Sequence, residues 1–109
     1  RGGTTPNYER AIVQKYVEQL GSEGMEPGII VDASHGNSGK DWQQQMQVID
    51  YLSKARHPSI RGLMVESFIR DGSQSVLNKP LEYGISITDS CIGFDKTAAL
   101  MIQLNNTIR

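Results

Sequence analysis

Three short apolar runs in this chain each end on a side chain that can bind a metal ion. The runs are Gly28-Ile-Ile-Val-Asp-Ala-Ser-His35, Arg61-Gly-Leu-Met-Val-Glu66 and Gly84-Ile-Ser-Ile-Thr-Asp89. Parallel strands of an α/β barrel carry their functional side chains at their carboxyl ends, which meet on one rim. The pattern therefore predicts that His35, Glu66 and Asp89 converge at the carboxyl edge of a parallel sheet.

The strands in this interpretation comprise residues 29–31, 60–66 and 84–88. The first is continuously apolar and β-branched, as expected for a parallel strand covered on both faces. The third alternates Ile with Ser and Thr. Residues 67–83 show no helical period and contain Asp71-Gly72 and Pro80, so we expect a long loop between the second and third strands.

Three helices are expected around these strands, over residues 6–20, over residues 42–55 and after residue 95. Thr5 is a candidate N-cap, with Pro6 in the first helical position. Ser38 and Asp41 stand at the spacing of a capping box, and Asp95 is a candidate N-cap for the last helix. The alternation of helices and strands is typical of a parallel α/β sheet.

The length of the chain limits this architecture. An eight-stranded barrel needs roughly 200 residues or more, whereas the chain has 109. We therefore expect residues 1–109 to form an incomplete, C-terminal portion of a single (β/α)8 TIM barrel domain, with parallel strands and flanking helices. The opening Arg1-Gly2-Gly3, without a Met, favours this interpretation of the chain as a fragment.

The composition excludes several classes of function. The 11 Lys and Arg residues nearly balance the 12 Asp and Glu residues, and no basic block indicates nucleic-acid binding. No apolar stretch approaches the length of a membrane span, and no signal-type segment is evident. Cys91 is the only cysteine, which fits a reducing compartment. We expect a cytoplasmic protein that uses neither nucleic acid nor membrane as a partner.

An imidazole and two carboxylates form a mixed nitrogen and oxygen ligand set. Such a set suits a divalent Mn, Fe, Co or Zn ion and leaves positions open for water or substrate. The alternative is that His35 bonds to backbone, Glu66 is a solvated rim charge and Asp89 caps the following turn. The spacing alone leaves both interpretations open.

Two further residues have two interpretations each. Cys91 is either a fourth ligand or a small buried hydrophobic residue, and we favour burial. Arg1 offers a guanidinium fork that can grip a phosphate or carboxylate, or it is a disordered terminal residue.

Four segments of the chain together resemble a known family. They are Arg1-Gly2-Gly3, Val31-Asp32-Ala33-Ser34-His35-Gly36-Asn37-Ser38, Met64-Val65-Glu66-Ser67 and Tyr83-Gly84-Ile85-Ser86-Ile87-Thr88-Asp89-Ser90-Cys91-Ile92-Gly93. In order and spacing they resemble the carboxyl-terminal portion of the microbial type I 3-deoxy-D-arabino-heptulosonate 7-phosphate (DAHP) synthases. The resemblance covers essentially the whole chain.

The resemblance implies a metal-dependent (β/α)8 barrel enzyme, a transferase that condenses phosphoenolpyruvate with erythrose 4-phosphate and releases phosphate. This reaction is the first step of the shikimate pathway, which leads to the aromatic amino acids. The family's metal ligands are a Cys, a His, a Glu and an Asp, and the last three match His35, Glu66 and Asp89. The family's Cys belongs to an earlier strand, and Cys91 does not match it.

The resemblance also implies substrate contacts. Arg1 matches an arginine that holds the phosphate of phosphoenolpyruvate. His35 is expected to act in catalysis as ligand and near neighbour of phosphoenolpyruvate, and Asp89 to lie on the sugar-phosphate side of the site. Because the Cys ligand and most phosphate-binding residues of the family lie upstream, we expect the isolated chain to be inactive.

Two alternatives to this function remain. A half barrel exposes unpaired strand edges, so the chain is either a homo-oligomeric enzyme portion or a non-catalytic folding and assembly module. The other alternative is the related 3-deoxy-octulosonate 8-phosphate synthase, which uses arabinose 5-phosphate. The segment from Ile87 to Gly93 favours the DAHP synthases.

Overall fold

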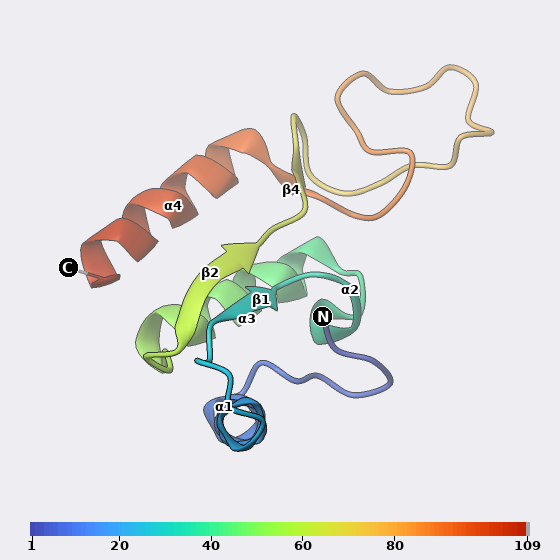
Figure 1. The fold of residues 1–109 in the computed structure, drawn as a ribbon. Coiled ribbons are helices and arrows are strands. Elements are labelled where there is room, and N and C mark those ends of the chain that lie inside the picture. Colours follow the sequence, from blue (N-terminus) through green and yellow to red (C-terminus); the bar gives the residue numbers. More distant parts are fainter. Residues whose placement is uncertain (109) are drawn as a thin grey trace.

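The structure is a computed structural model that describes residues 1–108. Its helices and strands, shown in Figure 1, are α1 (Arg10–Ser22), β1 (Ile29–Asp32), α2 (His35–Ser38), α3 (Trp42–Lys54), β2 (Ile60–Met64), β3 (Ser67–Phe68), β4 (Ile92–Gly93) and α4 (Phe94–Ile108). Among the described residues, none of the helices combines the length and apolar character required to cross a bilayer.

Strands β1 and β2 are parallel neighbours, and α3 lies between them in the chain and packs against them (Figure 1). Ile30 pairs with Gly62 and Asp32 with Met64. A second, shorter parallel pair joins β3 to β4. A parallel pair requires a crossover connection, and the β1–α3–β2 unit supplies it with a helix. The predicted fold class, α/β with parallel strands and flanking helices as in part of a (β/α)8 barrel, is confirmed.

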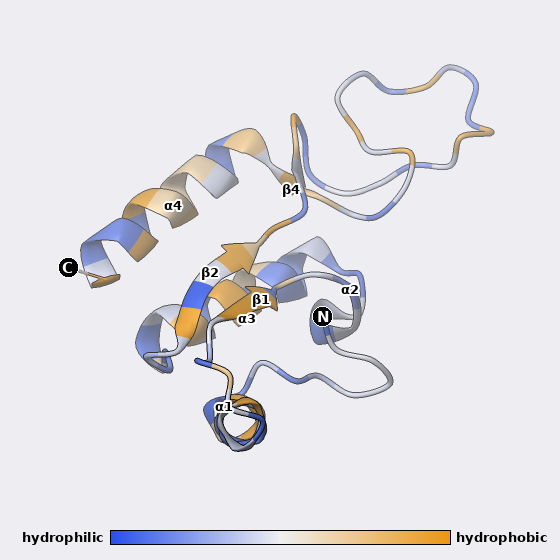
Figure 2. Ribbon diagram, viewed as in Figure 1, coloured by the Kyte–Doolittle hydropathy of each residue, from blue (hydrophilic) through white to orange (hydrophobic). Residues whose placement is uncertain are grey.

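The hydrophobic core lies between this sheet and the helices. Its buried members are Val13, Val31, Ala33, Val48, Ile49, Leu52, Ile60, Ile92 and Leu100. Figure 2 shows that β1 and β2 are among the most hydrophobic stretches of the chain. Ile30, by contrast, is 70% exposed, so the prediction that the first strand is covered on both faces is wrong for this chain. In a closed barrel that face lines the interior.

The first helix begins later than predicted. Helix α1 starts at Arg10, and its N-cap residue Glu9 makes no side-chain cap bond, so Thr5 is not the cap. The residues before α1 are held by tertiary contacts instead: the Asn7 N–H donates to Asn37 Oδ1 at 2.7 Å. This bond to the α2 turn outweighs the local helix signal of Thr5-Pro6.

The second helix is capped by one of the two predicted residues. Asp41 is the N-cap of α3, and its side chain accepts from the Gln43 N–H at 2.8 Å. Ser38 is buried in the short helix α2, so the capping box is wrong. The predicted end of the helix is confirmed, since α3 ends at Lys54 with Ala55 as its C-cap.

The predicted strand over residues 84–88 is wrong. That segment lies in the long loop between β3 and β4. Within the segment only Ser86 forms a bridge, to Ser73, and Ile87 is 49% exposed. The strand forms at Ile92–Gly93, because Ile92 is fully buried and Asp71 Oδ1 accepts from the Gly93 N–H at 2.7 Å. The alternation of Ile with Ser and Thr in the sequence therefore does not correspond to an alternation of buried and exposed side chains.

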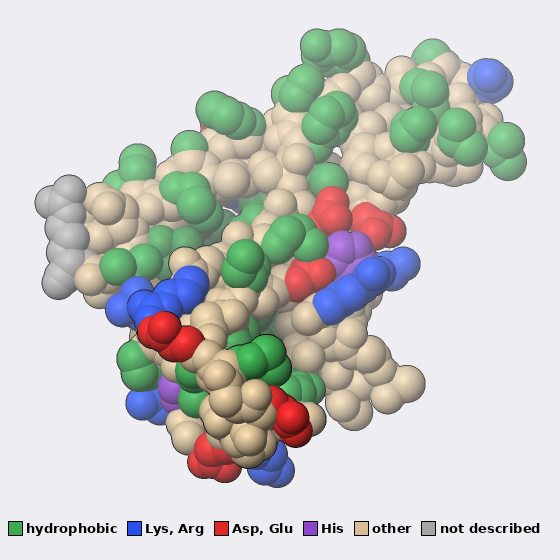
Figure 3. All heavy atoms as spheres, viewed as in Figure 1, with side chains coloured by type: hydrophobic (Ala, Val, Ile, Leu, Met, Phe, Trp, Pro, Cys, Tyr) green, Lys and Arg blue, Asp and Glu red, His purple; other side chains and the backbone are tan. Residues whose placement is uncertain are grey.

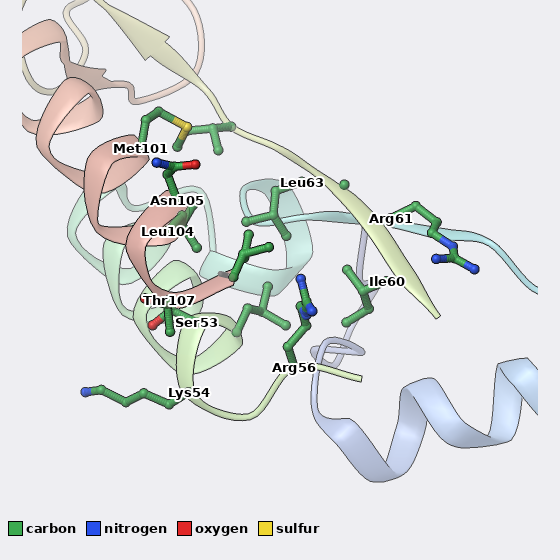
Figure 4. Close-up of a pocket in the computed structure, with 14 residues that line it drawn as sticks. Ser53, Lys54, Arg56, Ile60, Arg61, Leu63, Met101, Leu104, Asn105 and Thr107 are labelled. Atoms are coloured by element: carbon green, nitrogen blue, oxygen red, sulfur yellow. The ribbon is translucent and has the colours of Figure 1, made fainter. Parts of the chain in front are cut away.

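A cavity of about 480 Å³ lies between α3, β2 and α4. Figure 4 shows Leu63, Met101 and Leu104 against it, with Arg56 and Arg61 near the start of β2. None of His35, Glu66 and Asp89 lines this cavity. This cavity is therefore separate from the three residues that the sequence singles out.

Candidate metal centre

His35, Glu66 and Asp89 come together in the structure. One ligand atom from each side chain lies within 4.8 Å of the others. His35 Nε2 is 3.6 Å from Glu66 Oε1 and 3.4 Å from Asp89 Oδ2. Figure 3 shows a histidine surrounded by acidic side chains, with a basic side chain beside it, on the face in view. The predicted convergence of these three residues is therefore present in the structure.

The carboxyl ends of the strands account for this convergence. His35 follows β1 after a two-residue turn, Glu66 lies two residues beyond the end of β2, and Asp89 precedes β4. Since all described strand pairs are parallel, the segments after β1 and β2 emerge at the same edge. Asp89 reaches that edge from the long loop, and not from the end of a strand as predicted.

The backbone at His35 is in the left-handed region, with φ of 47°. This conformation costs a non-glycine residue about 1 kcal/mol or more, so other contacts must hold it. Asp32, at the end of β1, supplies two of them. Its Oδ1 accepts from the Ser34 N–H at 2.8 Å, and its Oδ2 lies 2.8 Å from His35 Nδ1.

The bond to Asp32 determines which nitrogen of His35 faces the acids. A carboxylate can only accept, so His35 Nδ1 carries the proton that it donates to Asp32. Nε2 then presents a lone pair to Glu66 and Asp89, whose oxygens also carry lone pairs. A cation held between them, or a second proton on the ring, removes this repulsion. The donor set and the carboxylate behind the histidine fit a divalent metal.

Lys40 adds a positive charge beside Asp89. Its Nζ lies 3.6 Å from Asp89 Oδ1, and its side chain is 62% exposed. An exposed pair of this kind contributes about 0–1 kcal/mol to stability. Its more direct effect is to offset part of the negative charge of the cluster.

Cys91 is buried, as favoured from the sequence, with 6% of its surface exposed. Its thiol donates to the Asp89 carbonyl oxygen at 3.4 Å. Burial raises the pKa of the Cys91 thiol, the negative charges of Glu66 and Asp89 raise it further, and a hydrogen bond with Ser86 opposes them. The cluster of ligand atoms found among the described residues consists of His35, Glu66 and Asp89 and does not include Cys91.

We predict that Cys91 reacts slowly with iodoacetamide. Because its pKa is raised, the thiolate is scarce at pH 8, and burial restricts access, so alkylation should be at least about 10-fold slower than in the urea-unfolded chain. Mass spectrometry of timed aliquots measures both rates. Equal rates with and without urea would contradict the buried placement.

Arg1 lies beside the turn that carries His35. Its carbonyl oxygen accepts from the Asn37 N–H at 3.2 Å, and its neighbour Gly2 packs against Gly36. A Cβ on Gly36 would lie 2.7 Å from the carbonyl carbon of Gly2, so this contact requires glycine. Arg1 is exposed and forms no ion pair with the residues described.

Two residues that support the cluster were not identified from the sequence. Asp32 orients His35, as described above, and the buried side chain of Gln45 bonds to the backbone of Glu66. An Asp three residues before a His at a strand end is a signal that could have indicated the first. No sequence signal indicates the second, because it depends on a contact between α3 and the segment after β2.

The parallel strands, the flanking helices and the polar side chains gathered at one edge define an α/β protein of the barrel type. Residues 1–101 match the family model described as the DAHP synthetase I family. The chain therefore belongs to that family, and the resemblance noted in the sequence is confirmed.

Individual relatives agree with this assignment. The chain is 40% identical over 113 residues to the phospho-2-dehydro-3-deoxyheptonate aldolase, Phe-sensitive, of Escherichia coli (strain K12), covering 100% of this chain and 32% of that protein. It is 38% identical over 113 residues to the Tyr-sensitive enzyme of the same strain, covering 99% of this chain and 32% of that protein. The chain thus spans about a third of the length of these curated relatives.

A solved structure shares the fold. The structure of phospho-2-dehydro-3-deoxyheptonate aldolase from Francisella tularensis SCHU S4 superposes with a TM-score of 0.93 at 33% sequence identity. The superposition covers 98% of this chain and 32% of that one.

Proposed function

We propose that this chain forms part of the active site of a metal-dependent DAHP synthase. The reaction condenses phosphoenolpyruvate with erythrose 4-phosphate to DAHP and phosphate, as the first step of the shikimate pathway. The observation that carries this proposal is the cluster of His35, Glu66 and Asp89, with ligand atoms within 4.8 Å of one another. Membership of the family supports it. We further propose that residues 1–109 are the C-terminal portion of a single barrel domain.

The three residues of the cluster would hold a divalent Mn, Fe, Co or Zn ion. When bound, such an ion polarises the sugar aldehyde or activates the water that adds at C2 of phosphoenolpyruvate. In the overall reaction C3 of phosphoenolpyruvate bonds to the aldehyde carbon, water adds at C2, and the C2 phosphate leaves.

The residues of the chain would bind and orient the substrates around this ion. His35, kept in one orientation by Asp32, would lie next to phosphoenolpyruvate, and Arg1 would neutralise its phosphate. Asp89, with Lys40 beside it, would lie on the sugar-phosphate side. Fixed charges of this kind hold two anionic substrates close enough for their carbons to react.

The partners in this proposal are the two substrates and further copies of the chain, in the cytoplasm and without nucleic acid or membrane. The described strands form two separate two-stranded sheets, so β1 and β2 each keep an unpaired edge, which supports a homo-oligomer. The same edges support the second candidate, a non-catalytic half-barrel module. Light scattering of the isolated chain measures its molar mass and so distinguishes a chain that associates through these edges from a monomer.

A chimera tests the catalytic proposal. The chain replaces the matching segment of the Phe-sensitive E. coli relative, to which it is 40% identical. We expect the chimera to form DAHP from both substrates, to lose activity with a chelator and to regain it with Mn²⁺. The isolated chain should show no turnover.

Two results would contradict this expectation. A folded chimera without metal-dependent activity would overturn the proposed function, and turnover by the isolated chain would overturn its expected inactivity. If the chimera does not fold, a calorimetric titration of the isolated chain with Mn²⁺ takes its place, and the absence of binding counts against the proposal.

A further inference from the structure

Gln45 makes two hydrogen bonds to the backbone of a single residue, Glu66. Its Oε1 accepts from the Glu66 N–H at 2.6 Å, and its Nε2 donates to the Glu66 carbonyl oxygen at 3.1 Å. The Gln45 side chain is completely buried. A buried primary amide that satisfies both backbone groups of one residue acts as a substitute for a neighbouring strand.

Glu66 needs such a substitute because it lies beyond the sheet. The last residue of β2 is Met64, which pairs with Asp32. Past this point β1 turns away toward His35, and the Glu66 N–H has no other hydrogen-bond acceptor within the described chain. The Glu66 carbonyl also accepts from the Ile92 N–H at 3.0 Å. Gln45 on one side and β4 on the other therefore hold the backbone from which the Glu66 carboxylate projects.

The amide of Gln45 is itself firmly placed. It lies in the first turns of α3, which Asp41 caps through the Gln43 N–H. Farther along the same helix, Val48 and Leu52 are buried in the core. Because the Gln45 amide is carried by a capped and packed helix, it restricts the position of the Glu66 backbone to which it bonds.

We propose that Gln45 is a positioning residue for the metal centre, which sets the direction of the Glu66 carboxylate toward His35. This inference rests on the proposed metal site and extends it to a residue that makes no contact with the ion. Its consequence is that metal affinity depends on an uncharged side chain in α3.

The test replaces Gln45 with methionine, which has a similar volume and no amide. The dissociation constant of the isolated chain for Mn²⁺ is measured by calorimetry, and the coordination is followed by the Mn²⁺ electron paramagnetic resonance spectrum. We expect the Gln45→Met variant to bind Mn²⁺ about 10-fold more weakly, with an altered spectrum, since loss of outer support typically weakens binding about 10- to 100-fold.

Two controls separate positioning from a general loss of stability. Gln44→Met makes the same replacement at the neighbouring exposed position. Leu52→Ala removes a buried side chain about two turns farther along α3 than Gln45 and destabilises the fold by a cavity. Circular dichroism measures the stability of each variant. Neither control should change the Mn²⁺ dissociation constant at a temperature where the chain is folded.

The outcomes distinguish this inference from the function on which it rests. If the unaltered chain binds no Mn²⁺, the proposed metal site fails and the inference fails with it. If the unaltered chain binds but Gln45→Met binds equally well, only the inference is overturned. A loss of affinity in Leu52→Ala as large as that in Gln45→Met also overturns it, because the effect is then one of stability.

Discussion

Replacing His35 with alanine is expected to weaken Mn²⁺ binding by the isolated chain about 100-fold or more, which corresponds to about 2.7 kcal/mol. His35 is the only nitrogen ligand in the cluster. Without it, Glu66 and Asp89 remain as two negative charges that no imidazole bridges. Calorimetric titration measures the change, and in the chimera the same substitution should abolish DAHP formation.

The second histidine of the chain provides a matched control. His57 is buried, its Nε2 lies 2.7 Å from Gln14 Oε1, and its Nδ1 accepts from the Ser59 N–H. The His57→Ala variant should lower the free energy of unfolding, because it removes a buried side chain together with its two hydrogen bonds, and should keep its Mn²⁺ affinity. Equal affinity in His35→Ala and the unaltered chain would refute the metal site.

Replacing Asp32 with asparagine is expected to weaken Mn²⁺ binding about 10- to 100-fold. The asparagine oxygen can still accept from the Ser34 N–H, but its amide nitrogen then faces His35 Nδ1 and can only donate. The ring must therefore carry its proton on Nε2, and the lone pair that faces Glu66 and Asp89 is lost. Nitrogen NMR of the histidine ring reports the change of tautomer, and calorimetry reports the affinity.

The control for this prediction removes the same charge elsewhere. Asp41→Asn also deletes one carboxylate, and asparagine is as good an N-cap as aspartate, so α3 should be unaffected. If Asp41→Asn weakens Mn²⁺ binding as much as Asp32→Asn, the effect is one of net charge and the tautomer argument is wrong.

The convergence of His35, Glu66 and Asp89 could be predicted from the sequence because parallel strands end at one edge. That rule requires only the order of the strands and the residue at each end. The rule was sufficient to bring His35 and Glu66 to the same edge, because they follow the first two strands. Asp89 reached the expected place for a different reason, since the segment before it is a loop and the strand forms at Ile92–Gly93.

The wrong predictions of the strand over residues 84–88 and of the helix start at Thr5-Pro6 have a common physical cause. A run such as residues 84–88 alternates like a strand, but alternation predicts a strand only where one side is buried, and burial is decided by the whole fold. Thr5-Pro6 carries the local signal of a helix start, yet the bond between Asn7 and Asn37 places this segment against α2. In both cases a contact between distant residues overrides a local preference.

The supporting residues were harder to predict than the candidate ligands. Gln45 is 21 residues from Glu66 in the chain, and in the sequence it is one of three consecutive glutamines. Only the position of α3 relative to β2 distinguishes it from its exposed neighbours. Roles that consist of one side chain holding the backbone of another element leave no pattern in a single sequence.

The long loop between β3 and β4 is fastened near its two ends and open at its tip. Gly72 pairs with Cys91 and Ser73 with Ser86, while Leu77 and Tyr83 are 81% and 84% exposed. Insertions or deletions around Leu77 can therefore change the outline of the molecule without displacing Asp89. The tip is a place where members of one family can diverge in the surfaces that they present while their chemistry stays the same.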